Sequence, residues 1–304
     1  MLVTGAWNVA KEHIAEIESK GHTVVFMQYE ADELPCAYEW VEGTICNGLF
    51  LSHPIDKFTN LKYIQLTSAG FDRVPMEYIN AHGIEIHNAH GVYSIPMAEF
   101  AVSGVLQLYK QARFFQKNQS EHKWEKHRGL LELCGKTVCV VGCGSVGTEC
   151  AKRFKAFDCT VVGIDLFPRE TEYFEKILPF EKVDAVIPKT DIMILTVPLT
   201  DKTKHLINED KLALMKFGAV LVNISRGAVV DENALIEALK TKLRGAVLDV
   251  FESEPLMEGS PLWNMDNVIL TPHNSFVGDK NGERLSNLIN INIENYKVKE
   301  GKSK

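Results

Sequence analysis

The stretch VVGCGSVG, residues 140 to 147, lies almost halfway along a chain of 304 residues. It reads as a β-strand that ends in a turn with three glycines, Gly142, Gly144 and Gly147, and it opens a helical pattern over residues 145–157. At this spacing the first glycine allows the tight turn, the second lets a pyrophosphate approach the backbone, and the third lets helix and strand pack closely. The helix N-terminus offers free N–H groups and a positive dipole to the anion. The stretch therefore predicts a dinucleotide-binding site.

An acidic residue ends the next predicted strand. Asp165 comes 18 residues after Gly147, near the spacing of about 20 residues expected for the acid that binds a ribose 2′-hydroxyl. Because a carboxylate there would repel a 2′-phosphate, Asp165 favours NAD over NADP. Arg169 could reach a phosphate from the same loop, so NADP stays open as the less favoured cofactor.

Composition restricts the class of protein. A chain of this length with 45% apolar residues exceeds the size at which one core usually keeps growing, so two domains are expected. The net charge of −7 carries no basic run, which argues against binding to nucleic acid or to an anionic membrane. The sequence has no apolar run of membrane-spanning length and no secretory signal, so we expect a cytoplasmic protein. Seven cysteines form no CxxC pair, and we assign them no metal and no redox role.

Short β-branched runs alternate with helical patterns twice along the chain, which is typical of α/β folds with parallel sheets. In the first half, helices are expected at 10–20 and 75–82, and strands at 22–26, 44–46, 61–66 and 84–87. In the second half, six strands are expected, at 136–141, 160–165, 191–196, 219–224, 245–249 and 268–270. Each half is therefore predicted to form its own doubly wound sheet.

Two further helical patterns lie at the boundaries of these halves. Residues 96–116 are almost continuously apolar, which favours a helix that is buried on several sides. Such a helix could pack between domains or subunits, or it could be a core helix of one domain. Residues 116–130 are charged and are expected to form a loop, and residues 283–296 are expected to form a helix that crosses back to cover the first domain.

Three stretches in the second half each follow a predicted strand: LVNISRGAVVDENAL (221–235), AVLDVFESEPL (246–256) and LTPHNS (270–275). Their polar residues should gather at the carboxyl edge of the sheet, where open α/β sheets bind ligands. This places Arg226, Glu254 and His273 near one another. Individually, each has a simpler interpretation, namely a surface ion pair, a turn acid and a structural histidine. Their joint placement is what favours a chemical role.

The three side chains suit hydride transfer at a carbonyl beside a carboxylate. Arg226 can bind the carboxylate in a planar, two-point grip and polarise the carbonyl. His273 can give a proton to the oxygen and take it back in the reverse direction. Glu254, bonded to the other ring nitrogen, would favour the imidazolium form. On spacing alone, Glu252 competes with Glu254 for this place.

The same stretches, together with TVPLTDKTKHLIN (196–208), resemble the D-isomer-specific 2-hydroxyacid dehydrogenase family over nearly the whole chain. That family includes phosphoglycerate, glycerate, hydroxypyruvate and D-lactate dehydrogenases. The resemblance implies two doubly wound α/β domains with the active site in the cleft between them. A discontinuous, flavodoxin-like substrate domain would comprise residues 1–96 and 276–304, and an inserted NAD-binding Rossmann domain would comprise residues 97–275. The insertion of the NAD-binding domain would explain why the glycine turn lies almost halfway along the chain.

The resemblance also implies roles for individual residues. Arg226 would bind substrate, His273 would be the acid/base, and Glu254 would be its partner. The stretch TSAGFDRV (67–74) is similar to a family loop whose amides bind the substrate carboxylate, so Ala69 and Gly70 are candidates, although an ordinary turn at Gly70 is the alternative. Asp249 would hold the carboxamide of the cofactor. The full set of implied cofactor contacts is Gly142, Gly144, Ser145, Val146, Gly147, Asp165, Thr196, Val197, Pro198, Thr203, Ile224, Ser225, Arg226, Asp249 and His273.

Some features leave alternatives open. NAHGVYSIPMAEFAV (88–102) resembles the start of an interdomain helix that in relatives contributes to a homodimer, but Ile95-Pro96-Met97 stands where smaller residues are commoner. The stretch HNSFVGDKNGER (273–284) lacks the usual glycine-rich continuation, which leaves the substrate open.

The leading hypothesis is reversible, NAD-dependent reduction of a small 2-oxo acid to a D-2-hydroxy acid. An NADH-binding, dimeric transcriptional corepressor is the alternative from another class. Formate dehydrogenase ranks lower, because that enzyme has a glutamine where Glu254 stands.

Overall fold

The computed structural model describes the backbone of residues 1–302 and the side chains of residues 1–296. The chain divides into two compact units. Unit 1 consists of Met1–Tyr93 together with the C-terminal residues from Gly278, and unit 2 consists of Ser94–Val277. Both are α/β units built on parallel sheets, which confirms the predicted fold class. No helix within residues 1–302 is long and apolar enough to cross a membrane.

Unit 1 has a five-stranded parallel sheet in the order β2-β1-β3-β4-β5. The strands are β1 (Leu2–Thr4), β2 (Val25–Met27), β3 (Gly43–Cys46), β4 (Tyr63–Leu66) and β5 (Glu85–His87). The helices are α1 (Ala10–Ser19), α2 (Leu49–Ser52), α3 (Met76–Ala81) and α10 (Asn281–Lys302), with single 3-10 turns η1 (Tyr38–Trp40) and η2 (Ile55–Lys57). The sequence analysis missed β1. That strand is three residues long and buried on both faces, so it has no alternation of apolar and polar residues to recognise.

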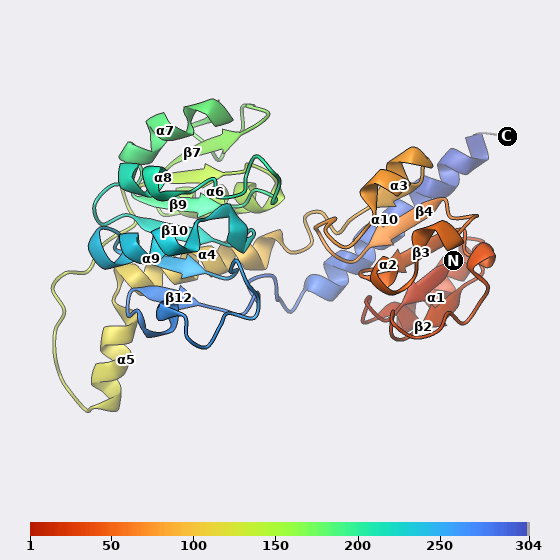
Figure 1. Ribbon diagram of the computed structural model, residues 1–304, viewed down its shortest axis with the longest axis horizontal. Coiled ribbons are helices and arrows are strands. Elements are labelled where there is room, and N and C mark those ends of the chain that lie inside the picture. The colour runs from red at the N-terminus through yellow and green to blue at the C-terminus, as the bar shows by residue number, and fades with distance from the viewer. Residues whose placement is uncertain (303–304) are drawn as a thin grey trace. The chain divides into compact units, whose positions relative to one another are not determined.

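Successive strand residues of unit 1 point into two separate cores. Val3, Ile45 and Tyr63 pack with α1 and α10, whereas the neighbouring Leu2, Cys46 and Ile64 pack on the other face with α2 and α3. Figure 1 shows α10 running along the sheet of unit 1. The apolar residues that it buries within the described part of the helix are Leu285, Ile289 and Ile293. The prediction that the last helix covers the first domain is therefore confirmed.

Unit 2 has a seven-stranded parallel sheet in the order β12-β11-β10-β9-β6-β7-β8. The strands are β6 (Thr137–Val141), β7 (Thr160–Asp165), β8 (Lys176–Pro179), β9 (Ile192–Leu195), β10 (Val220–Asn223), β11 (Gly245–Leu248) and β12 (Val268–Leu270). The prediction of six strands was wrong, because β8 was missed. It is an edge strand that begins with a lysine and ends with a proline, a composition that protects edges and hides them from sequence analysis.

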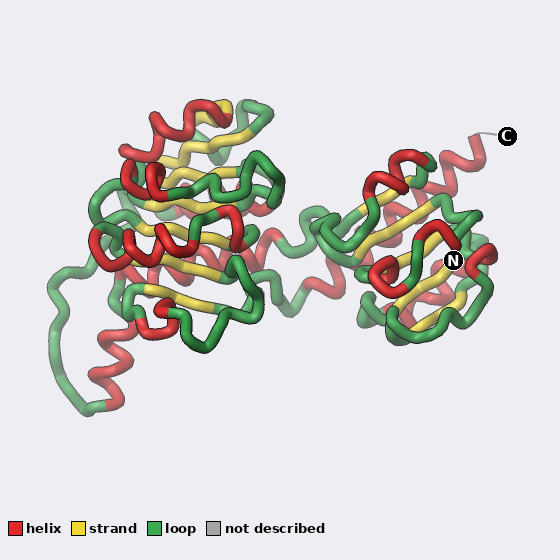
Figure 2. The backbone as a smooth tube through the Cα atoms, viewed as in Figure 1, coloured by secondary structure: helices red, strands yellow, loops and turns green. Residues whose placement is uncertain are grey.

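Helices cover both faces of the unit 2 sheet, as the layers in Figure 2 show. On one face, Val138, Val140 and Ile194 pack with the helices α4 and α6. On the other face, the strand residues that alternate with them, such as Cys139 and Val141, pack with α7, α8 and α9. The helices are α4 (Ser94–Tyr109), α5 (Ala112–Ser120), α6 (Ser145–Ala156), α7 (Val183–Val186), α8 (Glu209–Leu214) and α9 (Glu232–Thr241), with 3-10 turns η3 (Phe180–Lys182), η4 (Ile187–Lys189), η5 (Gly227–Val229) and η6 (Pro261–Asn264).

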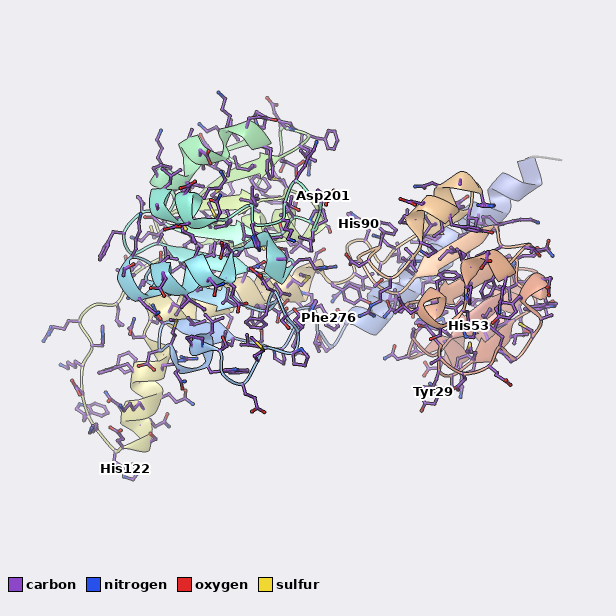
Figure 3. The ribbon with its side chains drawn as sticks, in the orientation of Figure 1. Tyr29, His53, His90, His122, Asp201 and Phe276 are labelled. Carbon is purple, nitrogen blue, oxygen red and sulfur yellow. The ribbon has the colours of Figure 1, made fainter. Side chains whose placement is uncertain are left out.

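The helix expected over residues 96–116 is in fact two helices, α4 and α5. The break falls at Gln111, whose φ of 55° is left-handed and cannot continue a helix. The loop expected from residue 116 starts only after Ser120. We call α5 and the loop that follows it, residues 112–132, the arm. It stands away from the sheet of unit 2 (Figure 1), and His122 marks its tip (Figure 3).

Candidate active site

The glycine turn after β6 leaves open space at one position only. Gly142 has a φ of 94°, which a side chain would strain. A Cβ on Gly147 would lie 2.0 Å from the carbonyl oxygen of Gly142, so α6 and the end of β6 are in backbone contact. A Cβ on Gly144, by contrast, would meet nothing within 4 Å. The turn therefore has free space where the α6 N-terminus can receive a pyrophosphate, with Ser145 and Val146 in the first turn of the helix.

Asp165 and Arg169 both contact the glycine turn. The Asp165 carboxylate accepts hydrogen bonds from the backbone N–H groups of Cys143, at 2.6 Å, and Phe167, at 2.9 Å. The Arg169 guanidinium donates to the Cys143 carbonyl oxygen. Burial, together with the Asp165 charge, raises the pKa of the Cys143 thiol to about 12, so this cysteine stays a neutral thiol. A negative and a positive side chain thus lie beside the same turn.

Other predicted cofactor residues follow the ends of β9 and β10, and the polar atoms of several hydrogen-bond to neighbouring loop residues. Thr196 donates its hydroxyl to the Gly142 carbonyl at 2.6 Å, and Thr203 donates to the Pro198 carbonyl at 2.7 Å. Ser225 donates to the side chain of Asn223 at 2.8 Å. Val197 and Ile224 are buried. The structure brings all of these residues to the carboxyl edge of the unit 2 sheet.

Asp249 lies at the end of β11 and is 1% exposed. Its two carboxylate oxygens accept hydrogen bonds from the Thr271 hydroxyl at 2.6 Å, the Asn274 amide at 2.7 Å, and the Ser275 amide and hydroxyl at 3.0 and 2.5 Å. These donors flank His273, whose own amide donates to the Asp249 carbonyl at 2.8 Å. Asp249 therefore fixes the histidine loop, a role that the sequence analysis missed. Its contact with a carboxamide stays a prediction. The residue in the sequence that could have indicated this role is Ser275, which bonds Asp249 through its amide and its hydroxyl and lies in the stretch that departs from the family pattern.

His273 is paired with Glu254. Its Nδ1 lies 2.9 Å from Oε2 of the carboxylate, and the two side chains are 44% and 38% exposed. The other oxygen of Glu254 accepts from the Phe251 amide at 3.1 Å. With Nδ1 engaged, Nε2 is the ring nitrogen that can exchange a proton with a ligand. The Phe276 ring, labelled in Figure 3, meets the imidazole edge-on with centroids 6.4 Å apart.

Glu252 contacts a different histidine. Its carboxylate lies 3.0 Å from Nε2 of His205 and accepts a hydrogen bond from the Glu232 amide, the first of α9, also at 3.0 Å. The Glu252 amide in turn lies 3.4 Å from a carboxylate oxygen of Glu232. Spacing alone left Glu252 and Glu254 as competing partners of His273. The structure gives that contact to Glu254.

Arg226 follows β10, and its loop packs directly on the segment that carries Glu254. A Cβ on Gly227 would lie 1.8 Å from the carbonyl carbon of Phe251 and 2.4 Å from the amide nitrogen of Glu252. Only glycine permits this contact between backbones. Arg226, Glu254 and His273 thus follow the neighbouring strands β10, β11 and β12, and the first two are on segments in backbone contact.

Ala69 and Gly70 lie in unit 1, in the loop after β4. Their carbonyl oxygens accept hydrogen bonds from Asn88, at 2.6 Å, and from Ser68, at 3.1 Å. Neither of their amide groups hydrogen-bonds to another of the described residues. Free amides beside occupied carbonyls are the arrangement that can bind an anion.

Comparison with known proteins agrees with this fold. Residues 102–275 match the model of the family described as "D-isomer specific 2-hydroxyacid dehydrogenase, NAD binding domain". A glyoxylate reductase of Thermofilum pendens is 37% identical over 246 residues, which are 79% of this chain and 73% of that protein. A structure of D-lactate dehydrogenase from Aquifex aeolicus with NAD and lactic acid has a TM-score of 0.77 and 27% identity, covering 97% of this chain and 94% of that one. A D-isomer specific 2-hydroxyacid dehydrogenase from Xanthobacter autotrophicus with NADPH and MES has a TM-score of 0.78 and 27% identity, covering 96% and 94%.

The doubly wound sheet with this glycine turn, together with the match to the family model, defines a dinucleotide-dependent oxidoreductase. The chain belongs to the D-isomer-specific 2-hydroxyacid dehydrogenase family. Members of this family are NAD-dependent oxidoreductases that act on the CH–OH group of 2-hydroxy acids.

We expect Gly227→Ala to disrupt the site. The added Cβ would overlap the backbone of Phe251 and Glu252, which cannot rotate away as a flexible side chain could. The Arg226 loop and the Glu254 segment would have to separate, and a displacement of about 1 Å at a reacting group can cost on the order of 100-fold in rate. The measurements are turnover and the thermal midpoint. Gly259→Ala is the matched control, because a Cβ there meets nothing within 4 Å, and it should change neither quantity. Equal behaviour of the two variants would contradict the prediction.

Glu232→Gln should stabilise the fold at neutral pH. Burial, with the neighbouring Glu252 charge added, raises the pKa of Glu232 above its ordinary value. The folded state therefore binds this proton more tightly than the unfolded state, and the wild type loses stability as pH rises from the ordinary to the raised pKa. Unfolding at pH 7 should show a gain for Glu232→Gln that disappears below about pH 4. Glu209→Gln, at the exposed start of α8, should show no such gain. A gain for Glu232→Gln that is independent of pH would contradict this assignment.

Proposed function

We propose that the protein reduces a small 2-oxo acid to the corresponding D-2-hydroxy acid with NADH, reversibly. The observation that carries this proposal is the contact of His273 with Glu254 on segments that follow β12 and β11, beside the arginine loop that follows β10. A positively charged group, a proton donor and a dinucleotide turn at one sheet edge are what reduction of a carbonyl beside a carboxylate requires.

The residues divide the work as follows. Arg226 binds the substrate carboxylate and polarises the C2 carbonyl. The amides of Ala69 and Gly70, in unit 1, can bind an anion such as a carboxylate. His273 holds a proton at Nε2 and gives it to the carbonyl oxygen, after which the ring regains a proton from solvent. Glu254, at Nδ1, orients the ring and balances its positive charge. When bound, the nicotinamide supplies the hydride to C2. The reverse reaction uses His273 as the base.

NAD is the favoured cofactor. The support is the Asp165 carboxylate at the end of β7, held by two backbone amides beside the glycine turn, where it would repel a 2′-phosphate. Arg169 is the opposing feature, and its guanidinium already donates to the Cys143 carbonyl. The solved relatives include complexes with NAD and with NADPH.

A panel of small 2-oxo acids, followed by the absorbance of NADH and then of NADPH, tests this function. We expect turnover with at least one member, faster with NADH, and a loss of about 100-fold or more in turnover for His273→Ala with NADH binding retained. His82→Ala, an exposed histidine of unit 1, serves as control and should keep full activity. Absence of turnover with every acid would refute the proposal and leave a binding protein. Full activity of His273→Ala would refute the residue assignment.

We further propose that the protein is a homodimer whose interface includes the groove between α4 and α6. This groove has a volume of about 660 Å³, and its apolar lining includes Val102, Leu106, Ala156 and Phe157. The same chain carries the arm, on which Trp124 is 99% exposed and Leu130 is 40% exposed. An apolar groove and exposed apolar side chains on the otherwise charged arm of the same chain suit a twofold contact between two copies, in which each copy contributes both surfaces.

Phe157→Glu should convert this dimer to a monomer, because it places a charge in the apolar groove. Phe157 is 41% exposed, and so is Leu214 on α8, outside the groove. Leu214→Glu is therefore the matched control and should stay dimeric. Sedimentation equilibrium measures the mass of each. A monomeric wild type, or a dimeric Phe157→Glu protein, would contradict this interface.

A further inference from the structure

Two glutamate–histidine contacts lie on one short segment. Glu254 pairs with His273 at 2.9 Å, and two residues earlier Glu252 lies 3.0 Å from His205. The proposed reaction uses only the first pair. Both histidines have left-handed backbones, with φ of 51° at His273 and 48° at His205. Such conformations cost energy in residues other than glycine and persist only where the surroundings enforce them.

The surroundings of Glu252 are fixed from several sides. His205 donates its amide to the Ala228 carbonyl at 2.7 Å, so the histidine is tied to the loop that leads into α9. Glu252 accepts from the first amide of α9, at Glu232, while its own amide faces the Glu232 carboxylate. The backbone of Gly227 lies in close contact with the peptide between Phe251 and Glu252. The contact of Glu252 with His205 is at ion-pair distance, without the geometry of a hydrogen bond.

Glu254, by contrast, has few restraints of its own. Its carboxylate meets the Phe251 amide and His273, and its side chain is 38% exposed. The segment from Phe251 to Glu254 forms no helix or strand, so the position of Glu254 follows from whatever anchors the residues before it. The anchored residue is Glu252.

We propose that Glu252 is a positioning residue, which ties the Phe251–Glu254 segment to the start of α9 and to His205 so that the Glu254 carboxylate meets His273. This inference rests on the proposed function, because it assigns Glu252 to the proton-transfer step through Glu254. Glu252 acts on the His273–Glu254 pair only through the position of Glu254, and it exchanges no proton with substrate.

The energetics agree with a positioning role. Glu252 and Glu232 are two carboxylates in contact, and the burial of Glu232 together with the Glu252 charge raises the pKa of Glu232. Two neighbouring acids reduce stability at neutral pH. Stability alone therefore does not explain a glutamate at position 252 beside Glu232. A role in holding two backbone segments in register does explain it, because such a role can offset the loss of stability.

The test is a double-mutant cycle on turnover. Glu252→Ala should lower kcat about tenfold, with the KM for NADH changed less than twofold. Glu252→Gln should recover most of the loss, because its amide oxygen can still accept from Glu232. In the Glu254→Gln background, Glu252→Ala should cost less than about twofold, since residues that act through one another are not additive. Glu258→Gln, exposed on the following loop, is the control and should leave kcat unchanged.

The outcomes separate the two proposals. A wild type without turnover refutes the proposed function. A wild type that turns over, with Glu252→Ala equal to it, refutes only the positioning role. An equal loss in both backgrounds also refutes it, because Glu252 would then act independently of Glu254. If Glu252→Ala does not fold, as judged by circular dichroism, the cycle is run with His205→Asn. Asparagine tolerates the left-handed backbone and removes the ion-pair partner, and full turnover in that variant overturns the proposal.

Discussion

The buried carboxylate of Asp249 is the constraint on which the site depends. A carboxylate that is 1% exposed is costly unless every oxygen is hydrogen-bonded. Here four donors from three residues meet that demand, and all of them lie in the loop around His273. The loop cannot shift without leaving a buried charge unpaired. The left-handed backbone of His273 is the strained conformation that these contacts enforce.

The second constraint is the close approach of backbones at glycines. At Gly147 the helix α6 meets the end of β6, and at Gly227 the arginine loop meets the segment of Glu254. At both glycines the two backbones lie so close that no side chain would fit between them. These contacts therefore fix the distance between the two elements more firmly than the packing of flexible side chains would. The site is therefore positioned mainly by backbone geometry at the sheet edge, and Arg226, Glu254 and His273 inherit their places from it.

These constraints explain what the sequence could predict. The apolar strands and the glycine turn carry strong local patterns, and the carboxyl edge of a parallel sheet gathers the residues that follow its strands. Arg226, His273 and one of the two acids Glu252 and Glu254 could therefore be expected there from order alone. Central β1 and edge β8 could not, because one is too short and fully buried and the other is polar. The left-handed Gln111 that separates α4 from α5 has no local signal. Likewise, Glu252 and Glu254 are equivalent by spacing, and only the tertiary contacts with His205 and His273 distinguish them.

Charges beside the glycine turn bear on cofactor choice in the same way. Asp165 is fixed by two backbone amides, so its charge cannot swing away from a ligand that approaches the turn. Arg169 donates from one of its guanidinium nitrogens to the Cys143 carbonyl, so its position is also tied to the glycine turn. A fixed anion beside a partly engaged cation supports the proposed preference for NAD over NADP. This support comes from the hydrogen bonds of the two side chains, which their presence in the sequence does not reveal.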